Sequence, residues 1–310
     1  MAVDSLSTRD LLTRPDRRRH LVDQVMRVVV GAAFLLAMVP LVSLIWIVIA
    51  EGYQRLSPYF LTVSMRGVFG GMDAGGIYHA IVGTLLVTGA AALISVPIGM
   101  MTAVYLVEYG RGPLARAVTF FVDVMTGIPS IVAGLFAYAL FAVFFGPGVR
   151  MGVVGAVALS VLMIPVVVRS TEEMLRLVPN ELREASLALG VPKWRTIVNV
   201  VLRTAAAGIV TGIMLSIARV IGETAPLLIT LGVVDSINTD LFDGRMMTLP
   251  VYIFRQYSQG LVPCAPDQID CIATINFDRA WAAALVLVLI VLLLNLIARY
   301  VARRFAPKGH

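Results

Sequence analysis

The sequence has little charge, cysteine or histidine. Only 14% of its 310 residues are charged and 59% are hydrophobic, whereas a soluble domain carries about 25% charged residues. With a mean hydropathy of +0.88, the chain is not an ordinary soluble enzyme. Its three histidines are His20, His79 and His310. They are scattered along the chain and indicate no metal site.

The sequence also lacks the common catalytic motifs. It has no Gly-xxxx-Gly-Lys-Ser/Thr loop for nucleotides, no His-Glu-xx-His for zinc and no Gly-x-Ser-x-Gly nucleophile turn. We therefore expect no catalytic residue and no bound cofactor or metal. The net charge of +6 would suggest nucleic acid in a soluble protein, but basic loops at a membrane surface explain it better. No nucleic-acid partner is expected.

Long apolar runs, by contrast, are abundant. Six of them are about 20 residues or longer and predict six transmembrane helices in an all-α polytopic membrane protein. They are Val25–Ala50, Ile77–Val107, Ala117–Phe145, Met151–Val168, Leu202–Val233 and Trp281–Ala302. The expected organisation is a tail over 1–24, a six-span domain over 25–302 with loops at 171–201 and 234–280, and a tail over 303–310. The first apolar run is too long for a signal peptide, so we expect it to be retained.

The basic residues indicate how the chain is oriented. Most Lys and Arg residues lie in the two tails and in the second and fourth connections. The positive-inside rule then places both termini in the cytoplasm. The polar 234–280 loop lies outside, where a disulfide between Cys264 and Cys271 can persist. Two unlinked thiols are the alternative, because sequence alone does not give the distance between them.

The 171–201 loop contains a predicted short helix between Pro179 and Trp194. We expect Asn180 to cap its first turn, Gly190 to adopt the left-handed conformation after its last turn, and Pro192 to prevent its continuation. One face combines small and apolar side chains: Leu182, Ala185, Ser186 and Leu189. Such a face suits docking into a groove of another protein. A helix that lies on the membrane surface is the alternative.

A few charged residues lie inside the predicted spans. Insertion of one at the bilayer centre costs about 2.5–3.5 kcal/mol, so each is a functional candidate. Arg219 and Glu223 lie four residues apart in the fifth span and are expected to pair. Arg169 lies near the inner end of the fourth span, and Asp123 lies near the start of the third. The alternatives are a structural Arg219–Glu223 pair, an Arg169 that reaches the interface and an interfacial Asp123.

The fifth span also carries helix-breaking residues. Gly222 and Pro226 flank Glu223, and they predict a break or kink beside the charges. A guanidinium at such a break can donate two parallel hydrogen bonds to a tetrahedral oxyanion and does not lose its proton. Glu223 would then balance Arg219 whenever no anion is bound.

Two further features concern packing. Residues 241–257 of the outer loop contain enough apolar side chains for a short surface helix or a re-entrant segment, which either docks a soluble partner or covers the bundle. Gly208 and Gly212 in the fifth span permit close helix packing. The equivalent span of a second, similar subunit is the expected neighbour.

The loop helix carries a resemblance to a known family. Glu184-Ala185-Ser186 followed by Gly190 resembles the EAA loop of ABC-importer permeases. Leu182–Trp194 together with Ala218–Leu228 is similar to the PstA-type permeases of phosphate importers, and the likeness extends from about residue 77 to the C-terminus. Ile164-Pro165 with Arg169, and Thr248-Leu249-Pro250, belong to it. Two departures are Ser186, where the motif most often has Ala, and the Cys264–Cys271 segment.

This resemblance implies a type I ABC-importer permease fold in a bacterial cytoplasmic (inner) membrane and one half of a pathway for inorganic phosphate. It implies a substrate pathway that includes Arg219, Glu223 and Arg169. The residues implied in coupling to an ATPase are Glu181, Arg183, Glu184, Ala185, Leu189 and Gly190. The implied partners are a PstB-type ATPase homodimer that binds ATP and Mg, a PstC-type sister permease and an extracytoplasmic phosphate-binding protein. A permease for sulfate or molybdate and a membrane-embedded signalling scaffold remain the alternatives.

Overall fold

A computed structural model describes residues 17–265 and 270–305. Within these ranges the chain is helical and contains no β-strand. It divides into two units, residues 1–50 and 51–310, which are described separately. Five helices in the described residues are long and apolar enough to cross a membrane, and one bent pair makes a sixth crossing if it counts as a single span.

The first unit consists mainly of helix α2, Arg17–Gly52. Its 36 residues correspond to about 54 Å at 1.5 Å per residue, which exceeds a hydrocarbon core of about 30 Å. The predicted span Val25–Ala50 lies within it. Pro40 lies inside the helix.

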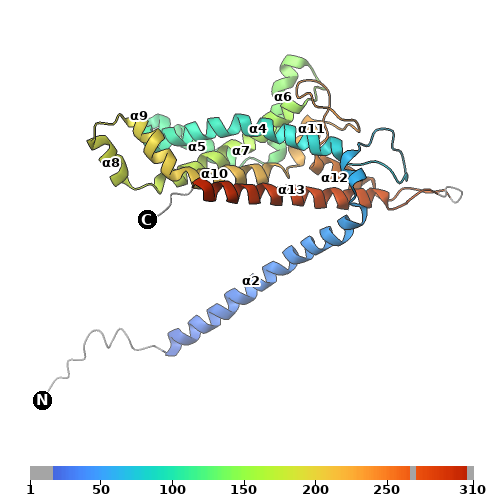
Figure 1. The fold of residues 1–310 in the computed structure, drawn as a ribbon, viewed down its shortest axis with the longest axis horizontal. Coiled ribbons are helices and arrows are strands. Elements are labelled where there is room, and N and C mark those ends of the chain that lie inside the picture. Colours follow the sequence, from blue (N-terminus) through green and yellow to red (C-terminus); the bar gives the residue numbers. More distant parts are fainter. Residues whose placement is uncertain (1–16, 266–269, 306–310) are drawn as a thin grey trace. The chain divides into compact units, whose positions relative to one another are not determined.

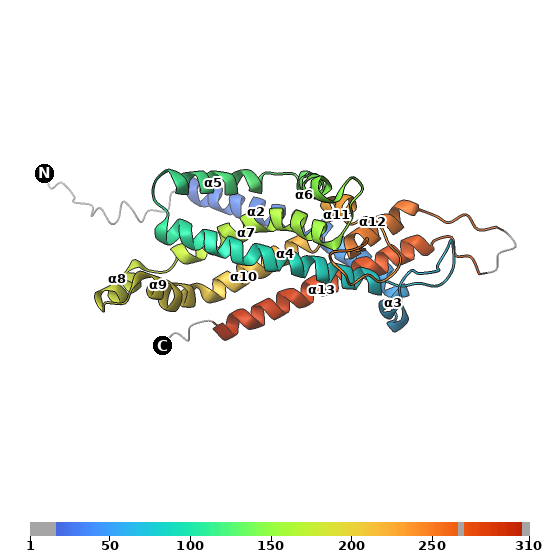
Figure 2. The ribbon, with the colours of Figure 1, turned by 90° about the horizontal axis from the view of Figure 1, so that it is seen from above.

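The second unit is built around four long helices, which run along one another in Figures 1 and 2. They are α4 (Tyr78–Val104), α7 (Gly152–Arg176), α10 (Leu202–Val220) and α13 (Ile275–Phe305). Helix α7 is central, because it packs against both α4 and α10. Leu159, Met163 and Val167 of α7 are fully buried in the main hydrophobic core.

The fourth span is longer than the sequence predicted. The apolar run predicts its end at Val168, but α7 continues for two further turns to Arg176. The apolar run ends at Arg169, so hydropathy alone places the end there. The charged residues beyond it, among them Glu172 and Arg176, form ion pairs on the helix. Those pairs allow the helix to continue with charged residues.

The third span is broken, which corrects the single run predicted over Ala117–Phe145. Helix α5 (Gly112–Thr126) and helix α6 (Ser130–Phe145) meet at an angle of 110°. The break contains Gly127 and Pro129. The residue before a proline is disfavoured in helical conformation, and Pro129 can begin a new helix but cannot continue the previous one.

The fifth span is also broken, at the predicted place. It begins with α9 (Lys193–Thr196) and a π-helical turn, η3 (Ile197–Val201), and continues as α10 to Val220. Residues 221–224 are not helical, and α11 (Ala225–Thr230) follows. Pro226 lies in the first turn of α11, where its missing N–H removes no helical hydrogen bond.

The small residues of the fifth span pack inside the chain, not against a second subunit as we predicted. A Cβ atom added to Gly208 would lie 2.2 Å from Met174 Sδ, and one added to Gly212 would lie 2.7 Å from Ser170 Cβ. Both neighbours belong to α7. The two glycines therefore set the close approach of α10 to α7.

The two ends of the second unit differ in structure (Figures 1 and 2). One end carries α8 (Asn180–Ala188), α9 and the π-helical turn η2 (Tyr105–Tyr109) that ends α4. The other end carries η1 (Tyr53–Arg55), α3 (Pro58–Thr62), α12 (Leu249–Gln259) and the cysteine segment.

Helix α12 covers the bundle. It packs against α13 and α4 and buries Leu249, Val251 and Tyr252. Its first turn is tied to α4, because Leu249 N donates to Thr84 Oγ1 at 2.8 Å. The structure therefore shows that residues 241–257 cover the bundle, which is one of their two predicted uses. The helix begins at Leu249, later than the start of the apolar pattern at residue 241.

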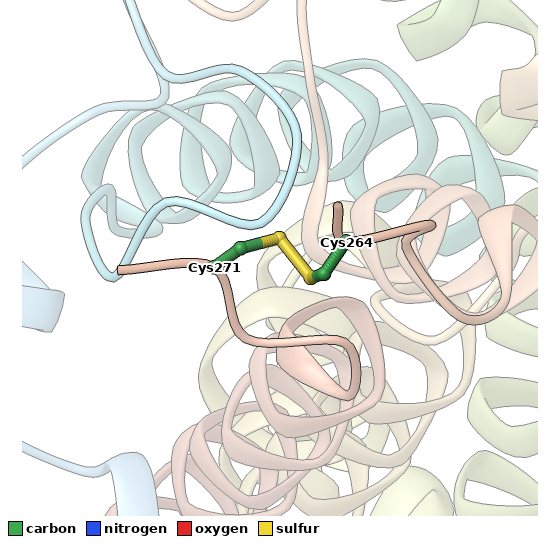
Figure 3. Close-up of a disulfide and its surroundings, with 2 residues drawn as sticks. All are labelled: Cys264 and Cys271. Atoms are coloured by element: carbon green, nitrogen blue, oxygen red, sulfur yellow. A yellow bond between two sulfur atoms is a disulfide. The ribbon is translucent and has the colours of Figure 1, made fainter. Parts of the chain in front are cut away.

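The cysteine segment is closed by a disulfide between Cys264 and Cys271, whose Cα atoms are 5.7 Å apart (Figure 3). The segment is joined to the loop over residues 63–77, because Ile272 N donates to Gly71 O at 2.9 Å. The backbone at residues 271–272 therefore pairs with residues 71–72.

Candidate functional site

Arg219 and Glu223 lie on either side of the break in the fifth span. Arg219 is in the last turn of α10 and is exposed, and Glu223 is half-buried in the non-helical link. The two do not form the predicted ion pair. Because α10 ends at Val220, they are no longer one helical turn apart, and Glu223 N instead donates to Val220 O at 3.1 Å. Within the described residues, Arg219 has no carboxylate partner within 4 Å.

Helices α6 and α11, which follow the breaks in the third and fifth spans, pack on each other. A Cβ atom added to Gly134 of α6 would lie 2.6 Å from the Cα atom of Pro226 in α11. The backbones of α6 and α11 are therefore in direct contact.

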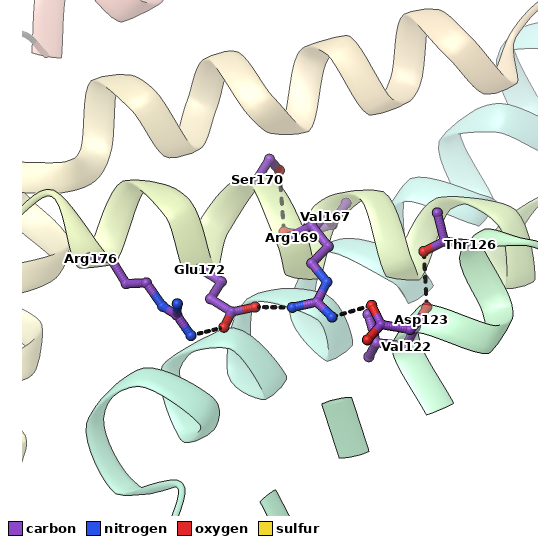
Figure 4. Close-up of polar contacts among 8 residues, drawn as sticks. All are labelled: Val122, Asp123, Thr126, Val167, Arg169, Ser170, Glu172 and Arg176. Atoms are coloured by element: carbon purple, nitrogen blue, oxygen red, sulfur yellow. Dashed lines mark hydrogen bonds and ion pairs between the residues drawn. The ribbon is translucent and has the colours of Figure 1, made fainter. Parts of the chain in front are cut away.

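Arg169 belongs to a network of four charged residues that joins α7 to α5 (Figure 4). Its Nη1 donates to Glu172 Oε2 at 2.8 Å, and its Nη2 donates to Asp123 Oδ1. Arg176 Nη2 donates to the other Glu172 oxygen, Oε1, at 2.5 Å. Two arginines and two carboxylates leave the group without net charge.

The centre of this network is Glu172, which is only 4% exposed. A buried carboxylate is costly unless it is paired and hydrogen-bonded, and both of its oxygens have an arginine partner here. Asp123 and Glu172 hold the Arg169 guanidinium. Asp123 is the exposed partner of the two.

Helix α8 ends as predicted but begins differently. Gly190 has a φ of +76°, Gly190 N donates to Leu187 O, and Val191 N donates to Ser186 O. These two bonds form a Schellman motif. Asn180, however, is the first helical residue and not the cap. Its Oδ1 accepts from Arg183 Nη1 at 3.1 Å, and no side chain caps the helix.

Arg183 attaches α8 to the rest of the chain. Its Nε donates to Glu108 Oε1 at 3.0 Å, and its Nη atoms donate to Leu175 O at 2.9 Å and Val178 O at 2.6 Å. Lys193 donates to the Glu108 carbonyl and lies 4.5 Å from the centre of the Tyr109 ring. Glu108 of η2 thus holds residues from both ends of the 180–196 segment.

The outward face of α8 carries the other predicted docking residues. Glu181, Glu184, Ala185 and Leu189 are exposed, and Leu189 is 84% exposed. Ser186 departs from the predicted shared face. It is the one buried residue of α8, and its hydroxyl bonds Thr196 Oγ1 at 2.9 Å. A serine at this place therefore ties α8 to α9, which an alanine would not do.

Three residues of these clusters carry no clear signal in the sequence. Hydropathy predicts Glu172 and Glu108 in or next to loops and Arg279 as a charge of the outer loop. The spacing of Glu172 from Arg169 (i, i+3) and from Arg176 (i, i+4) was a usable signal for ion pairs on one helix face. Nothing in the sequence links Glu108 to Arg183 or shows that Arg279 is buried.

Among the described residues, no group of three or more His, Cys, Asp or Glu side chains could hold a metal ion.

Comparison with known proteins places this arrangement in a family. Residues 95–308 match the family model of the binding-protein-dependent transport system inner membrane component. The chain is 49% identical over 291 residues to phosphate transport system permease protein PstA 1 of Mycobacterium tuberculosis, which covers 93% of this chain and 91% of the relative. It is 40% identical over 274 residues to PstA of Pasteurella multocida, which covers 86% and 90%.

A solved structure shares the fold. A bacterial alginate ABC transporter, in complex with an alginate pentasaccharide-bound periplasmic protein, contains a chain that matches with a TM-score of 0.64. The match covers 94% of this chain and 99% of the other at 14% identity. Together the family model and the relatives show that the chain belongs to the inner membrane components of binding-protein-dependent transport systems and, among them, to the PstA family of phosphate transport system permeases.

Proposed function

We propose that this chain is a permease subunit of an ATP-driven importer of inorganic phosphate and forms one half of the translocation pathway. The names of its relatives support the substrate. The observation in the structure that carries the proposal is Arg219, an exposed cation without a carboxylate partner in the described chain, at the break of a transmembrane helix.

The break itself favours a pathway. Non-helical backbone at membrane depth is tolerated where it is buried in protein or lines a water-filled cavity. Arg219 precedes the non-helical residues 221–224, so a passing oxyanion can bind its guanidinium. Glu223 lies in the same link and limits the affinity by repulsion. A weak site is required, because an anion that is bound too tightly cannot leave.

Arg169 has a different part in this proposal. Its guanidinium is held by Asp123 and Glu172, so an anion can bind it only by displacing one of them. Asp123 is the exposed partner and belongs to α5, whereas Glu172 is on the same helix. Arg169 therefore becomes available when α5 moves away from α7, as in a second conformation of the transporter.

The exposed face of α8 is the proposed docking site for the ATPase. Glu181, Glu184, Ala185 and Leu189 would contact the partner, and Gly190 and Arg183 would position the helix. Movement of α8 then reaches α4 through the Arg183–Glu108 pair and α9 through the Ser186–Thr196 bond. Both connections end at or beside π-helical turns, which are frequent at functional sites in proteins.

The complete transporter requires further subunits. We infer a homodimeric ATPase that binds ATP and Mg, a sister permease that supplies the other half of the pathway, and an extracytoplasmic binding protein that delivers phosphate. In this arrangement the α8 end lies in the cytoplasm and the disulfide end lies outside. ATP-driven closure of the ATPase moves α8 and alternates the access of the pathway.

Uptake in cells that lack the gene tests this function. The wild-type chain, expressed in such cells with its partner subunits, should restore the uptake of labelled phosphate at low micromolar concentration but not the uptake of labelled sulfate. Restored sulfate uptake would instead indicate a permease for another oxyanion. If neither anion depends on the chain while it is present in the membrane, the importer function is wrong and the scaffold alternative is favoured.

A further inference from the structure

A polar cavity of about 370 Å³ lies at the disulfide end of the second unit. It is separate from the broken fifth span and from α8. Its walls are formed by the loop over residues 63–77, the link before α12, α12 itself and α13. The lining residues that matter here are Phe69, Asp235, Arg255, Gln256, Asn276 and Arg279.

The charges in this cavity do not cancel. Arg255 Nη1 donates to Asp235 Oδ1 at 2.6 Å, so these two lining residues neutralise each other. Arg279 is only 2% exposed and, within the described chain, has no carboxylate within 4 Å. Its Nη2 donates to two carbonyl oxygens, of Met72 at 2.7 Å and of Ala74 at 2.9 Å, and its Nε has no partner. Two carboxylates, Asp73 and Asp278, favour its charge from beyond ion-pair distance, and Asp73 is itself paired with Arg55 at 2.6 Å. A buried cation with no carboxylate in direct contact is costly, so the cavity favours an anion.

The same cavity presents an unpaired acceptor. Gln256 is 2% exposed, and its Oε1 has no hydrogen-bond partner. Tyr252 lies one turn earlier on α12, and its hydroxyl also lacks a partner. Burial raises the pKa of Tyr252 above its usual value, so this hydroxyl stays protonated. The other amide in the wall, Asn276, is occupied, because its Nδ2 donates to Gly260 O at 3.0 Å.

We propose that this cavity binds a protonated phosphate anion, with Arg279 donating to a charged oxygen and Gln256 Oε1 accepting from the P–OH group. The ligand must carry an acceptor and a donor together, because a donor and an acceptor both lack partners in the cavity. Hydrogen phosphate carries both. Sulfate at neutral pH and the phosphodiester of a lipid headgroup have no O–H group and would leave Gln256 unpaired, which costs binding.

This inference rests on the proposed function and adds an outer binding station for the same substrate. Phosphate would bind here after delivery and before it reaches Arg219. A purely structural role for Arg279 is the competing explanation, since its Nη2 links the carbonyl groups of Met72 and Ala74. That role uses only one of its nitrogens and does not explain the unpaired Nε or the unpaired Oε1 of Gln256.

One substitution separates the two explanations. Gln256→Glu nearly preserves size and adds a negative charge to the cavity that Arg279 also lines, so an arginine with a structural role alone would be retained. The same carboxylate would repel an oxyanion. Ser258→Glu is the matched control, because it adds the same charge to an exposed position on the same helix outside the cavity wall.

The measurement is equilibrium dialysis of labelled inorganic phosphate with the purified transporter complex. All three variants carry Arg219→Gln, which removes the binding expected at the broken span. We expect binding to persist in Arg219→Gln and in Arg219→Gln/Ser258→Glu, and to weaken by about tenfold or more in Arg219→Gln/Gln256→Glu because of like-charge repulsion. Excess sulfate or phosphatidylglycerol vesicles should not displace the bound phosphate.

Equal binding by the Ser258→Glu and Gln256→Glu complexes would overturn the outer station, and so would displacement by sulfate or by the lipid. Wild-type uptake of phosphate together with no binding by the Arg219→Gln complex would overturn the outer station alone. Phosphate binding by that complex without any phosphate uptake by the wild type would contradict the proposed function alone.

Discussion

At the scale of single residues, Glu172 has the most demanding environment among the carboxylates of the ion network. It is buried, and each of its oxygens accepts from a different arginine. Arg169 extends the network to Asp123 on a neighbouring helix, so loss of Glu172 affects the contact between α5 and α7 as well as α7 itself.

Glu172→Gln should therefore destabilise the purified complex. Neutralising the buried carboxylate weakens two charge-assisted hydrogen bonds, and the expected loss is about 1–3 kcal/mol of the free energy of unfolding. Thermal or denaturant unfolding in detergent measures it. Glu173→Gln is the matched control, because Glu173 is the next residue and is exposed. Equal stability of the two variants would show that the network contributes nothing measurable.

Sequence reasoning found some members of these polar clusters and missed others for a physical reason. Arg219 could be found because it interrupts an apolar run, and Arg169 because it directly ends one. Glu172 and Arg279 flank such runs, where hydropathy cannot distinguish a helix that continues from a loop. Whether a flanking charge is buried depends on residues distant in sequence, such as Asp123 for Arg169 and the carbonyl groups of residues 72 and 74 for Arg279.

At the scale of elements, the two broken spans show how far local sequence signals can predict a break in a helix. The break after Val220 could be predicted because Gly222 and Pro226 lie beside charged residues. The break between α5 and α6 carries similar signals in Gly127 and Pro129, but no charged residue lies between them, and the apolar run continues across it. The sequence thus indicated a single helix, whereas the structure turns by 110° there.

The docking role of α8 predicts a loss of the ATPase when its outward charge is reversed. Glu184 is exposed and makes no contact that holds α8 in place, so Glu184→Lys should leave the helix intact. We expect at least about a tenfold decrease in the ATPase that co-purifies with the permease, since a like or unpaired charge at an interface costs several kcal/mol. Quantitative immunoblotting of the purified permease measures it.

Glu173→Lys is the control for this experiment, because it makes the same charge change at an exposed position on α7, outside α8. Normal recovery of the ATPase with Glu184→Lys would exclude this part of α8 from the interface. Loss of the ATPase with both variants would show that the effect is not specific to α8.

At the scale of the whole molecule, the two ends of the second unit should face different compartments. The only two cysteines of the chain are joined to each other, so the wild type offers no free thiol. Ser258→Cys at the disulfide end should react with a membrane-impermeant maleimide in intact cells. Leu177→Cys, at the exposed end of α7 next to α8, should react only after the membrane is opened.

The wild-type chain, which should not be labelled in either condition, is the control for this topology. Labelling of Leu177→Cys in intact cells, with Ser258→Cys protected, would reverse the orientation. The sequence alone allowed this prediction, because it rests on the connections and tails in which Lys and Arg are concentrated. The arrangement of the helices within the bundle could not be predicted in the same way, since it depends on close contacts such as Gly208 with Met174.

The most direct test of the central claim, that the broken fifth span carries the anion past Arg219, is the rate of phosphate uptake by Arg219→Gln in membrane vesicles with the assembled transporter. Removing a charged hydrogen bond to the anion should lower the rate by about one to two orders of magnitude, with the amount of assembled complex unchanged. Arg203→Gln removes the same charge from an exposed position on the same helix and should transport like the wild type. Uptake by Arg219→Gln at the wild-type rate would contradict the claim and remove Arg219 from the pathway.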